Sequence, residues 1–299
     1  MAARQEIVVR PEIEVGELGK AVTGDIARPL TMFERLSNMD IVRKFTVLLV
    51  VLAAWELYTR TSGVSELILP TFSATAKALV SAIFNESLLE MLWNSVKILL
   101  TGYLIGLVIA AVLTTFATVT RFGSDVLSTL TAMLNPLPAI ALLPLAMIWI
   151  GLTSGSIVFT LLHSVIWPVA LNAHTGFRSV SDTQRMVGRN YGLWGFSYVI
   201  KVLIPAALPS ILIGMRIGWA FAWRTLIAAE LVFGGAVIDT SGANKGGLGW
   251  FVFSNQMESQ VPAVFAGLLT IIVVGLLVEN IIFNTLENRT IRRWGMQSQ

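Results

Sequence analysis

The chain has 299 residues, of which 55% are hydrophobic and 13% are charged, and its mean hydropathy is +0.74. This composition is too apolar for an ordinary soluble domain and indicates an all-α, polytopic membrane protein. The net charge of +3 gives no reason to expect a nucleic-acid site, the lack of cysteine excludes disulfides and thiolate-ligated metals, and two histidines cannot form a zinc site alone.

The N-terminal segment differs from the rest of the chain. Its first 40 residues are polar and carry charges of both signs without a hydrophobic core, so we identify no cleavable signal peptide there. We expect residues 1–42 to form a cytoplasmic tail. The transmembrane domain is expected at residues 43–290, and residues 291–299 are expected to form a cytoplasmic C-terminal tail.

Length and hydrophobicity predict about six membrane-spanning helices. In chain order they cover approximately Phe45–Tyr58, Val96–Val119, Val126–Ile150, Ile157–Phe177, Leu208–Phe233 and Val261–Phe283. The third should be interrupted, because each proline removes a backbone donor and restricts the residue before it. We predict a break near Asn135 to Pro138 and a kink near Pro144, with the freed carbonyls facing protein or water.

Lysine and arginine residues are concentrated on one side of these helices. They lie before the first helix, between the second and third, between the fourth and fifth, and after the sixth. By the positive-inside rule this side is cytoplasmic. Both termini and the loop of residues 178–206 are therefore expected in the cytoplasm.

That loop should contain a short helix from about Thr183 to Tyr191. Ser181 and Asp182 are suitable N-cap residues, and Gly192 is a suitable C-terminal stop. The apolar edge of the helix would consist of Met186, Val187 and Tyr191, and the basic edge of Arg185 and Arg189. Such a helix fits a groove in a soluble partner, and the alternative is an interfacial helix lying on anionic lipid.

Two ionisable residues lie within the fifth expected helix. Arg224 and Glu230 each cost roughly 2.5 to 3.5 kcal/mol to insert, so they should face a bundle interior or an aqueous cavity. Their spacing places them about 120° apart around the helix, which argues against a mutual ion pair. Arg224 could attract an oxyanion with its planar fork of donors, or it could pair with Glu279 or cap carbonyls near Pro138. Arg216, nearer the cytoplasmic end, could extend to water.

Small residues and histidines also recur at helical spacing. Gly214, Gly218 and Ala222 form a stripe on the fifth helix that would let another helix approach closely, either from the same subunit or from a partner. His163 and His174 share one face of the fourth helix. Since no cysteine or carboxylate accompanies them, hydrogen-bonded packing is favoured over metal binding.

Several segments together resemble the permeases of binding-protein-dependent ABC importers. Gly192 is followed after nine residues by Val202-Leu203-Ile204-Pro205, which resembles the G-x9-I-x-L-P half of their cytoplasmic loop signature. The usual Glu-Ala-Ala of that signature is replaced by Met186, Val187 and Gly188. Further segments are similar to the nitrate, sulfonate, taurine and bicarbonate branch: Asn94-Ser95-Val96-Lys97 with Gly102, the proline-rich run ending at Trp149-Ile150-Gly151, Gly176–Val180, Phe221–Glu230 and Gly246–Gly249.

The resemblance covers roughly residues 45–295 and implies a type I ABC importer permease in the bacterial inner membrane. It further implies a second permease copy, two cytoplasmic ATPase subunits and a periplasmic or lipid-anchored substrate-binding protein. The chain itself would be no enzyme and hold no cofactor, since ATP binds to the partner and no G-x-x-x-x-G-K-[ST] motif occurs here.

Two groups of residues are the candidates for the function of such a permease. The ATPase-coupling loop would act through Arg185, Met186, Val187, Gly188, Arg189, Gly192 and Pro205. The candidates for the translocation path of a small anion are Arg224, Glu230, Asn135 and Pro138. Nitrate, a sulfonate such as taurine, bicarbonate and related organic acids remain open as substrates.

Two other classes of protein fit less well. A secondary transporter working without an ATPase is the main alternative, but such proteins commonly contain two similar halves and we find no internal repeat. An intramembrane enzyme would need a constellation such as H-E-x-x-H, which the sequence lacks.

Overall fold

The computed structural model describes residues 39–233 and 246–292. The chain divides into two compact units, Met1–Ala54 and Trp55–Gln299. Most of the predicted N-terminal tail and nearly all of the predicted C-terminal tail lie outside the described residues. Apart from the first part of helix α2, the second unit contains the structural features discussed below.

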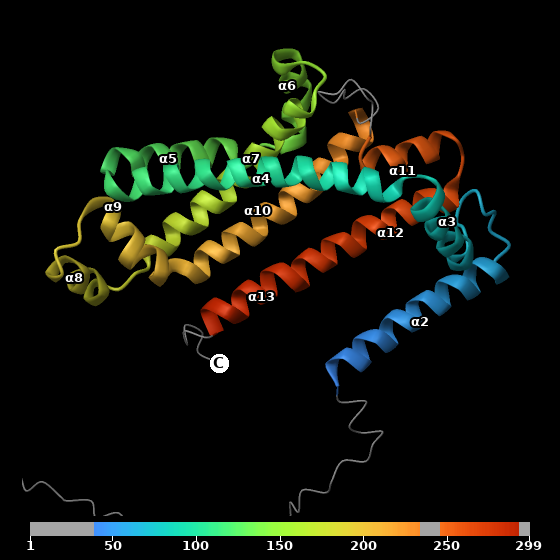
Figure 1. Ribbon diagram of the computed structural model, residues 1–299, viewed down its shortest axis with the longest axis horizontal. Coiled ribbons are helices and arrows are strands. Elements are labelled where there is room, and N and C mark those ends of the chain that lie inside the picture. The colour runs from blue at the N-terminus through green and yellow to red at the C-terminus, as the bar shows by residue number, and fades with distance from the viewer. Residues whose placement is uncertain (1–38, 234–245, 293–299) are drawn as a thin grey trace, which may run out of the picture. The chain divides into compact units, whose positions relative to one another are not determined.

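Helices make up the regular structure of the described residues, without a strand among them (Figure 1). The α-helices are α2 (Asp40–Thr61), α3 (Phe72–Asn85), α4 (Leu88–Val119), α5 (Arg121–Leu134), α6 (Leu143–Ile150), α7 (Ser154–Arg178), α8 (Asp182–Asn190), α9 (Gly195–Tyr198), α10 (Ile204–Phe233), α11 (Leu248–Met257), α12 (Val261–Leu277) and α13 (Asn284–Glu287). A 3₁₀-helix, η2, covers Ala139–Leu142. The π-helices are η3 (Val199–Leu203), η4 (Val278–Phe283) and η5 (Asn288–Arg292). The predicted all-α class is confirmed.

Four helical segments in the described part of the chain are long and apolar enough to cross a membrane. They are Leu88–Val119, Ser154–Arg178, Gly195–Phe233 and Val261–Ile291. The bent pair formed by α5 and η2–α6 adds a fifth if it is counted as one span. Helix α2, the first of the six predicted spans, is not among them, because charged residues such as Lys44 and Glu56 lie near both ends and shorten its apolar stretch.

The predicted break in the third span is confirmed, whereas the predicted kink at Pro144 is wrong. Helix α5 ends at Leu134, Pro138 precedes η2, and the two helical parts meet at an angle of 89°. Pro144 instead lies in the first turn of α6. The N–H groups in the first turn of a helix have no intrahelical acceptor. A proline at this position therefore breaks no helical hydrogen bond and does not kink the helix.

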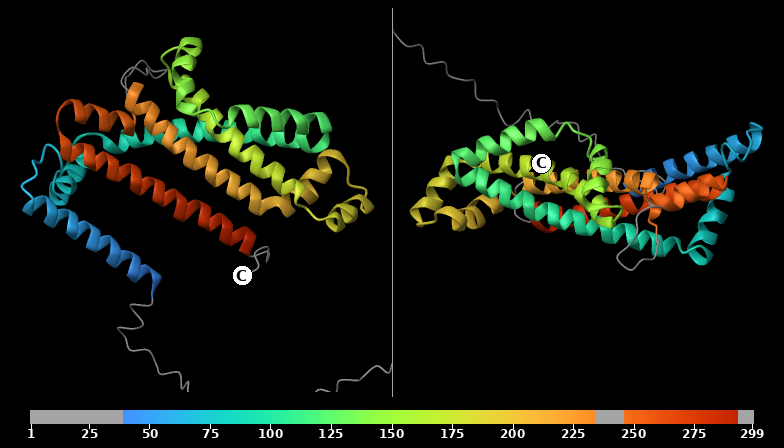
Figure 2. Two further views of the ribbon diagram at one scale, coloured as in Figure 1. Left: turned by 180° about the vertical axis from the view of Figure 1, so that it is seen from behind. Right: turned by 90° about the horizontal axis from the view of Figure 1, so that it is seen from above.

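Helix α7 packs closely against both α4 and α10 (Figures 1 and 2). Glycines permit this approach: a Cβ atom on Gly106 of α4 would lie 2.8 Å from Val165 Cβ. A Cβ atom on Gly214 of α10 would lie 2.8 Å from Asn172 Cβ. The small-residue stripe of α10 therefore contacts α7 of the same subunit, which resolves the alternative that the sequence left open.

The views in Figures 1 and 2 place α8 and α9 at one end of the second unit and α3 and α11 at the opposite end.

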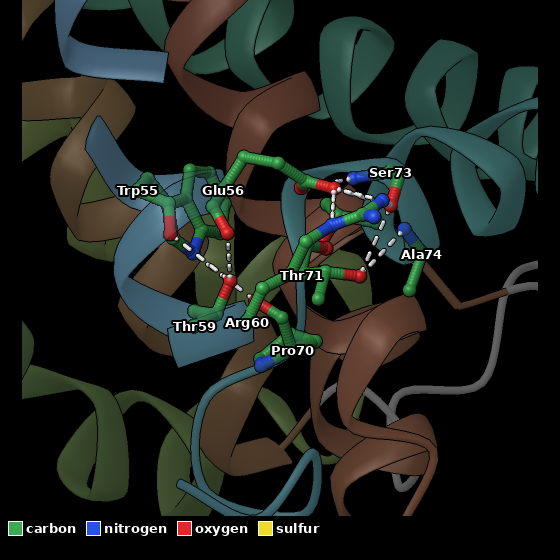
Figure 3. Close-up of polar contacts among 9 residues, drawn as sticks. Trp55, Glu56, Thr59, Arg60, Pro70, Thr71, Ser73 and Ala74 are labelled. Atoms are coloured by element: carbon green, nitrogen blue, oxygen red, sulfur yellow. Dashed lines mark hydrogen bonds and ion pairs between the residues drawn. The ribbon is translucent and has the colours of Figure 1, made fainter. Parts of the chain in front are cut away.

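Figure 3 shows the polar network at the start of α3. The Glu56 carboxylate accepts hydrogen bonds from Ser73 N–H (3.0 Å), Ser73 Oγ (2.9 Å) and Arg60 Nε (2.7 Å). Thr71 Oγ1 accepts from Ala74 N–H at 3.1 Å. An N-cap and a carboxylate thus satisfy the free donors of the first turn.

Candidate functional site

A cavity of about 390 Å³ lies where the break between α5 and α6 meets α7 and α10. We call it the helix-break cavity. It is lined by residues 135–140 of the break, by His163, Ser164, Trp167 and Pro168 of α7, and by Phe221, Arg224, Thr225 and Ala228 of α10. The fold thus brings together three of the four path candidates from the sequence, namely Asn135, Pro138 and Arg224.

Arg224 is the only charged residue among the described residues that line this cavity. Its guanidinium makes no hydrogen bond or ion pair with another residue in the described part of the chain. Neither structural partner proposed for it is used, because Glu279 binds Arg216 instead and no carbonyl near Pro138 accepts from Arg224. An unpaired guanidinium beside a cavity can bind an anion.

Two further nitrogen atoms beside the cavity lack a hydrogen-bond partner within residues 39–233 and 246–292. Trp167 is only 8% exposed, yet its Nε1 is unpaired, and the Nε2 of His163 is also buried and unpaired. Their rings are 6.1 Å apart between centroids, in an edge-to-face arrangement. By contrast, the hydroxyls of Ser164 and Thr225 bond to each other at 2.9 Å.

The sequence patterns assigned His163 to packing and did not point to Trp167. The signal that could have identified them is their spacing of one helical turn, which places two nitrogen-bearing rings on one face of α7. His174, on the same helix, does not line the cavity. No cluster of metal-ligating side chains occurs among the residues that the structure describes.

Glu230 lies away from the helix-break cavity. It is 2% exposed, and its carboxylate accepts from Ser95 Oγ at 2.8 Å and from Gly249 N–H at 3.0 Å. The Leu248 N–H donates in turn to Ser95 Oγ at 2.8 Å. Because Glu230 faces α4 and the start of α11, it joins three helices and satisfies the first donors of α11 rather than contributing to the same cavity as Arg224.

Arg216 forms the ion pairs that the sequence did not anticipate. Its Nε lies 3.1 Å from Glu279 Oε1, and its Nη2 lies 3.1 Å from Glu287 Oε2. The same Nη2 donates to Asn284 Oδ1 at 3.1 Å, and the guanidinium carbon is 5.8 Å from the centroid of the Phe283 ring. This cluster connects α10 to η4 and α13, so Arg216 does not simply extend to water.

We predict a small coupling between Arg216 and Glu279. Their side chains are 35% and 40% exposed, so solvent screens the pair, and a double-mutant cycle with Arg216→Gln and Glu279→Gln should give about 0.5 to 1 kcal/mol. The free energy is measured from the thermal unfolding of the solubilised protein. Additive effects of the two substitutions would show that the pair contributes no coupling.

The predicted helix in the loop of residues 178–206 is confirmed as α8. Ser181 is its N-cap and accepts from Gln184 N–H at 3.4 Å. Gly192 follows the helix with a φ of +70°, the left-handed conformation expected of a C-terminal stop. Pro205 lies in the first turn of α10, directly after the π-helix η3.

Arg185 does not belong to a free basic edge of α8, which corrects the expectation from spacing. Its Nε donates to Val180 O at 3.0 Å and its Nη2 to Phe177 O at 2.6 Å. The last carbonyls of α7 have no intrahelical partner, so a cation from the next helix satisfies them. Arg189 is left as the exposed basic residue of α8.

Helix α8 and the residues after it expose large apolar side chains, which we call the α8 patch. Its members are Met186, Val187, Tyr191, Trp194 and Phe196, with exposed fractions between 49% and 81%. Gly188 faces the opposite way and is buried, since a Cβ atom there would lie 2.9 Å from Val202 Cγ2 and 3.0 Å from Tyr198 Cε2. Gly188 thus seats α8 against the next helices and directs the patch outward.

Comparison with known proteins identifies relatives of this chain. A model of the family described as binding-protein-dependent transport system inner membrane component matches residues 102–292. The putative aliphatic sulfonates transport permease protein SsuC of Escherichia coli is 28% identical over 233 residues, covering 77% of this chain and 83% of that protein.

Two further relatives carry different substrate names. The taurine transport system permease protein TauC of Escherichia coli is 29% identical over 238 residues, which cover 78% of this chain and 82% of TauC. The nitrate import permease protein NrtB of Synechocystis sp. is 30% identical over 162 residues, which cover 54% of this chain and 55% of NrtB.

Proposed function

The chain belongs to the family of binding-protein-dependent transport system inner membrane components, and from this premise we propose that it is the permease subunit of an ATP-driven importer. It is a multi-pass membrane protein and an ABC transporter permease of the nitrate, sulfonate and taurine branch. Its role in the importer is to form the path for a small anion that an external binding protein delivers.

The observation that carries this proposal is Arg224 in the helix-break cavity, with which no residue of 39–233 and 246–292 pairs. A cationic group that has no counterion among the described residues, beside an interrupted helix, suits a water-accessible path for an anion. The names of the relatives specify aliphatic sulfonates, taurine and nitrate, each of which carries a negatively charged group of oxygen atoms that a guanidinium can bind. Asn135 and Pro138 form the wall of the path, whereas Glu230 holds the helices in place.

The importer contains a second copy of this chain, two cytoplasmic ATPase subunits and a periplasmic or lipid-anchored binding protein, in the inner membrane of a bacterium. Arg224 is exposed in the single subunit, so a second subunit is needed to enclose the path. The distribution of lysine and arginine supports a cytoplasmic location for both termini and for residues 178–206, within a transmembrane domain of residues 43–290.

The ATPase docks on the α8 patch, in the manner of a helix held in an apolar groove. Met186, Val187 and Tyr191 supply the apolar contacts, Arg189 supplies the exposed charge, and Gly188 and Gly192 set the position of the helix. Arg185 acts indirectly, because it fixes α8 to the end of α7. Pro205 lies in the first turn of α10, through which movement of α8 reaches the helix-break cavity.

A charge reversal tests this assignment. In proteoliposomes that contain the ATPase and the binding protein, Arg189→Glu should lower ATP-dependent uptake about tenfold, because it removes an exposed contact of roughly 1 to 2 kcal/mol without disturbing a buried group. Uptake is measured with nitrate, taurine, alkanesulfonates and bicarbonate.

The matched control is Arg121→Glu, a second exposed arginine on the expected cytoplasmic side, which should transport normally. If Arg189→Glu transports normally, or if it fails to insert into the membrane while its coupling of ATP hydrolysis to uptake is intact, α8 is a helix that only lies on lipid. Uptake by the chain without the ATPase or ATP would favour the secondary-transporter alternative.

A further inference from the structure

An apolar groove runs between the second half of α4 and the segment that leads from α9 into α10. Its walls include Val108 and Phe116 of α4, Phe196 of α9 and Ile200 of η3. We call it the α4–η3 groove, and we propose that it binds one acyl chain of an anionic phospholipid whose phosphate lies beside Lys201. The ligand is a membrane lipid, so the proposal does not depend on which anion the importer carries.

The groove is deeper than the ordinary lipid-facing side of a helix. It continues into a second apolar cavity, with which it shares Ala111, Thr115 and Ile204. Helix α7 contributes Val169 and Ala173 to this second cavity. A chain that lies there has neighbours from α4, α7 and α10, so it gains more dispersion contacts than a lipid on a single helix face. The shape therefore favours one held chain over exchanging lipids.

The lining of the groove offers no hydrogen bond to a polar ligand. Thr115 and Thr120 carry the only polar side chains among the described residues that line it. Thr115 Oγ1 donates to Ala111 O at 2.8 Å, and Thr120 Oγ1 donates to Phe116 O at 3.0 Å. Since both hydroxyls are satisfied within α4, an acyl chain can cover them without leaving an unpaired donor.

The length and depth of the groove match one leaflet of a membrane. The wall from Val108 to Thr120 rises about 18 Å, at about 1.5 Å per residue, and half of a hydrocarbon core measures about 15 Å. Thr120 follows the last residue of α4, at the end of the helix for which we propose a cytoplasmic location. An acyl chain of the cytoplasmic leaflet would therefore extend along the groove from this end.

Lys201 supplies a positive charge at the edge of the groove. Around η3, Val199 is buried, Ile200 lines the groove and Lys201 comes next as an exposed residue. Its ammonium forms no hydrogen bond or ion pair with another residue of 39–233 and 246–292. A lysine can lay its stem along apolar surface and place its charge at the level of the headgroups, where it attracts the anionic lipids of the cytoplasmic leaflet.

The groove adjoins the α8 patch, because Phe196 belongs to both. The apolar contacts that we assign to the ATPase are those of Met186, Val187 and Tyr191, and none of these three lines the groove. A lipid held in the groove would therefore lie next to the ATPase without occupying its contact.

Photo-crosslinking with defined lipids tests the site in the assembled importer. The importer is reconstituted into liposomes of phosphatidylcholine and phosphatidylglycerol, and a trace of one of these lipids carries a diazirine in its acyl chain. After illumination, mass spectrometry of peptides measures the labelling of residues 108–120 and 196–204. The reference is the labelling of Val273 and Leu276 of α12, which are exposed and lie outside the groove.

Relative to this reference, phosphatidylglycerol should label the groove about fivefold more than phosphatidylcholine, because of the charge of Lys201. Lys201→Gln removes that charge, so the labelling by the two lipids should become equal within about twofold while both still label the groove. These two results separate binding of the headgroup from binding of the chain.

A second substitution fills the groove. Ala111 lines the groove and is exposed, so Ala111→Trp should lower the labelling of the groove by either lipid about tenfold. Leu104→Trp is the matched control, because Leu104 is also exposed on α4 but lines neither the groove nor the cavity behind it. This control should be labelled in the groove like the unaltered protein.

Three results would overturn the proposal. Labelling of α12 without labelling of the groove would show that another subunit covers it. Equal labelling by the two lipids in the unaltered protein would remove the assignment to an anionic lipid. Unchanged labelling in Ala111→Trp would show that lipids only pass over the surface. If Ala111→Trp does not assemble, Lys201→Gln decides, since exposed side chains are usually replaced without loss of the fold. The importer proposal is tested separately, by the coupling of uptake to ATP hydrolysis.

Discussion

Replacing Gly249 by alanine is expected to prevent the protein from assembling stably. A Cβ atom at this position would lie 2.6 Å from Ile227 O and 2.8 Å from Leu231 N, and these backbone atoms cannot rotate away. The start of α11 would have to move, which would break the hydrogen bond from Gly249 N–H to Glu230. Overpacking of this kind together with a lost buried hydrogen bond should cost about 3 kcal/mol or more.

The measurement is the thermal stability of the solubilised protein together with its amount in the membrane. Gly275→Ala is the matched control, because the nearest atom to its Cβ would be Trp223 Nε1 at an ordinary 3.5 Å. Since Gly275 lies inside α12, alanine there should be neutral or stabilise by about 0.5 to 1 kcal/mol. Equal stabilities of the two variants would show that α11 is not held against α10 in the way described.

Replacing Arg224 by glutamine should lower uptake per assembled importer at least about tenfold. The substitution removes the only charged side chain among the described residues of the helix-break cavity, and a hydrogen bond to a charged group is worth about 1.5 to 3 kcal/mol. Arg224→Lys should restore uptake only in part, because a point charge lacks the planar fork of donors. Uptake is divided by the amount of assembled complex, so that a loss of protein is not mistaken for a loss of transport.

Arg216→Gln provides the comparison, since it makes the same chemical change on the same helix. Arg216 binds Glu279 and Glu287 outside the cavity, so its loss should lower stability slightly and leave uptake per complex unchanged. Unchanged uptake per complex in Arg224→Gln would remove the anion-binding role and, with it, the main support for the position of the path.

Features that depend on local backbone chemistry could be predicted from the sequence. Pro136 and Pro138 interrupt the third span wherever they lie in the fold, because the missing donor and the restricted φ belong to the residues themselves. The cap at Ser181 and the stop at Gly192 are local in the same sense. The kink predicted at Pro144 was wrong because the effect of a proline depends on whether it lies inside a helix or in the first turn.

The C-terminal end of α2 shows the limit of composition as a guide. Glu56 and Arg60 shorten the apolar stretch of α2, and the structure uses Glu56 to hold the start of α3 through Ser73. Glu56 and Ser73 are close in sequence, yet no periodic pattern predicts the turn that brings them together. Only the meeting of the two helix ends supplies the acceptor for the free N–H groups of α3.

By itself, the sequence determined the all-α membrane class and the separation of Arg224 from Glu230 around one helix, because these follow from composition and from the helical period. It also determined the position of the helix break and the caps of α8, because these follow from local backbone chemistry. Only the tertiary structure decided which side chains share a site. Glu230 bonds to Ser95 across 135 residues of sequence, and Trp167 and Arg224 line one cavity because glycines let α7 and α10 approach. Hydrogen-bond partners and cavities arise from helix packing, and no local pattern encodes which helix faces will meet.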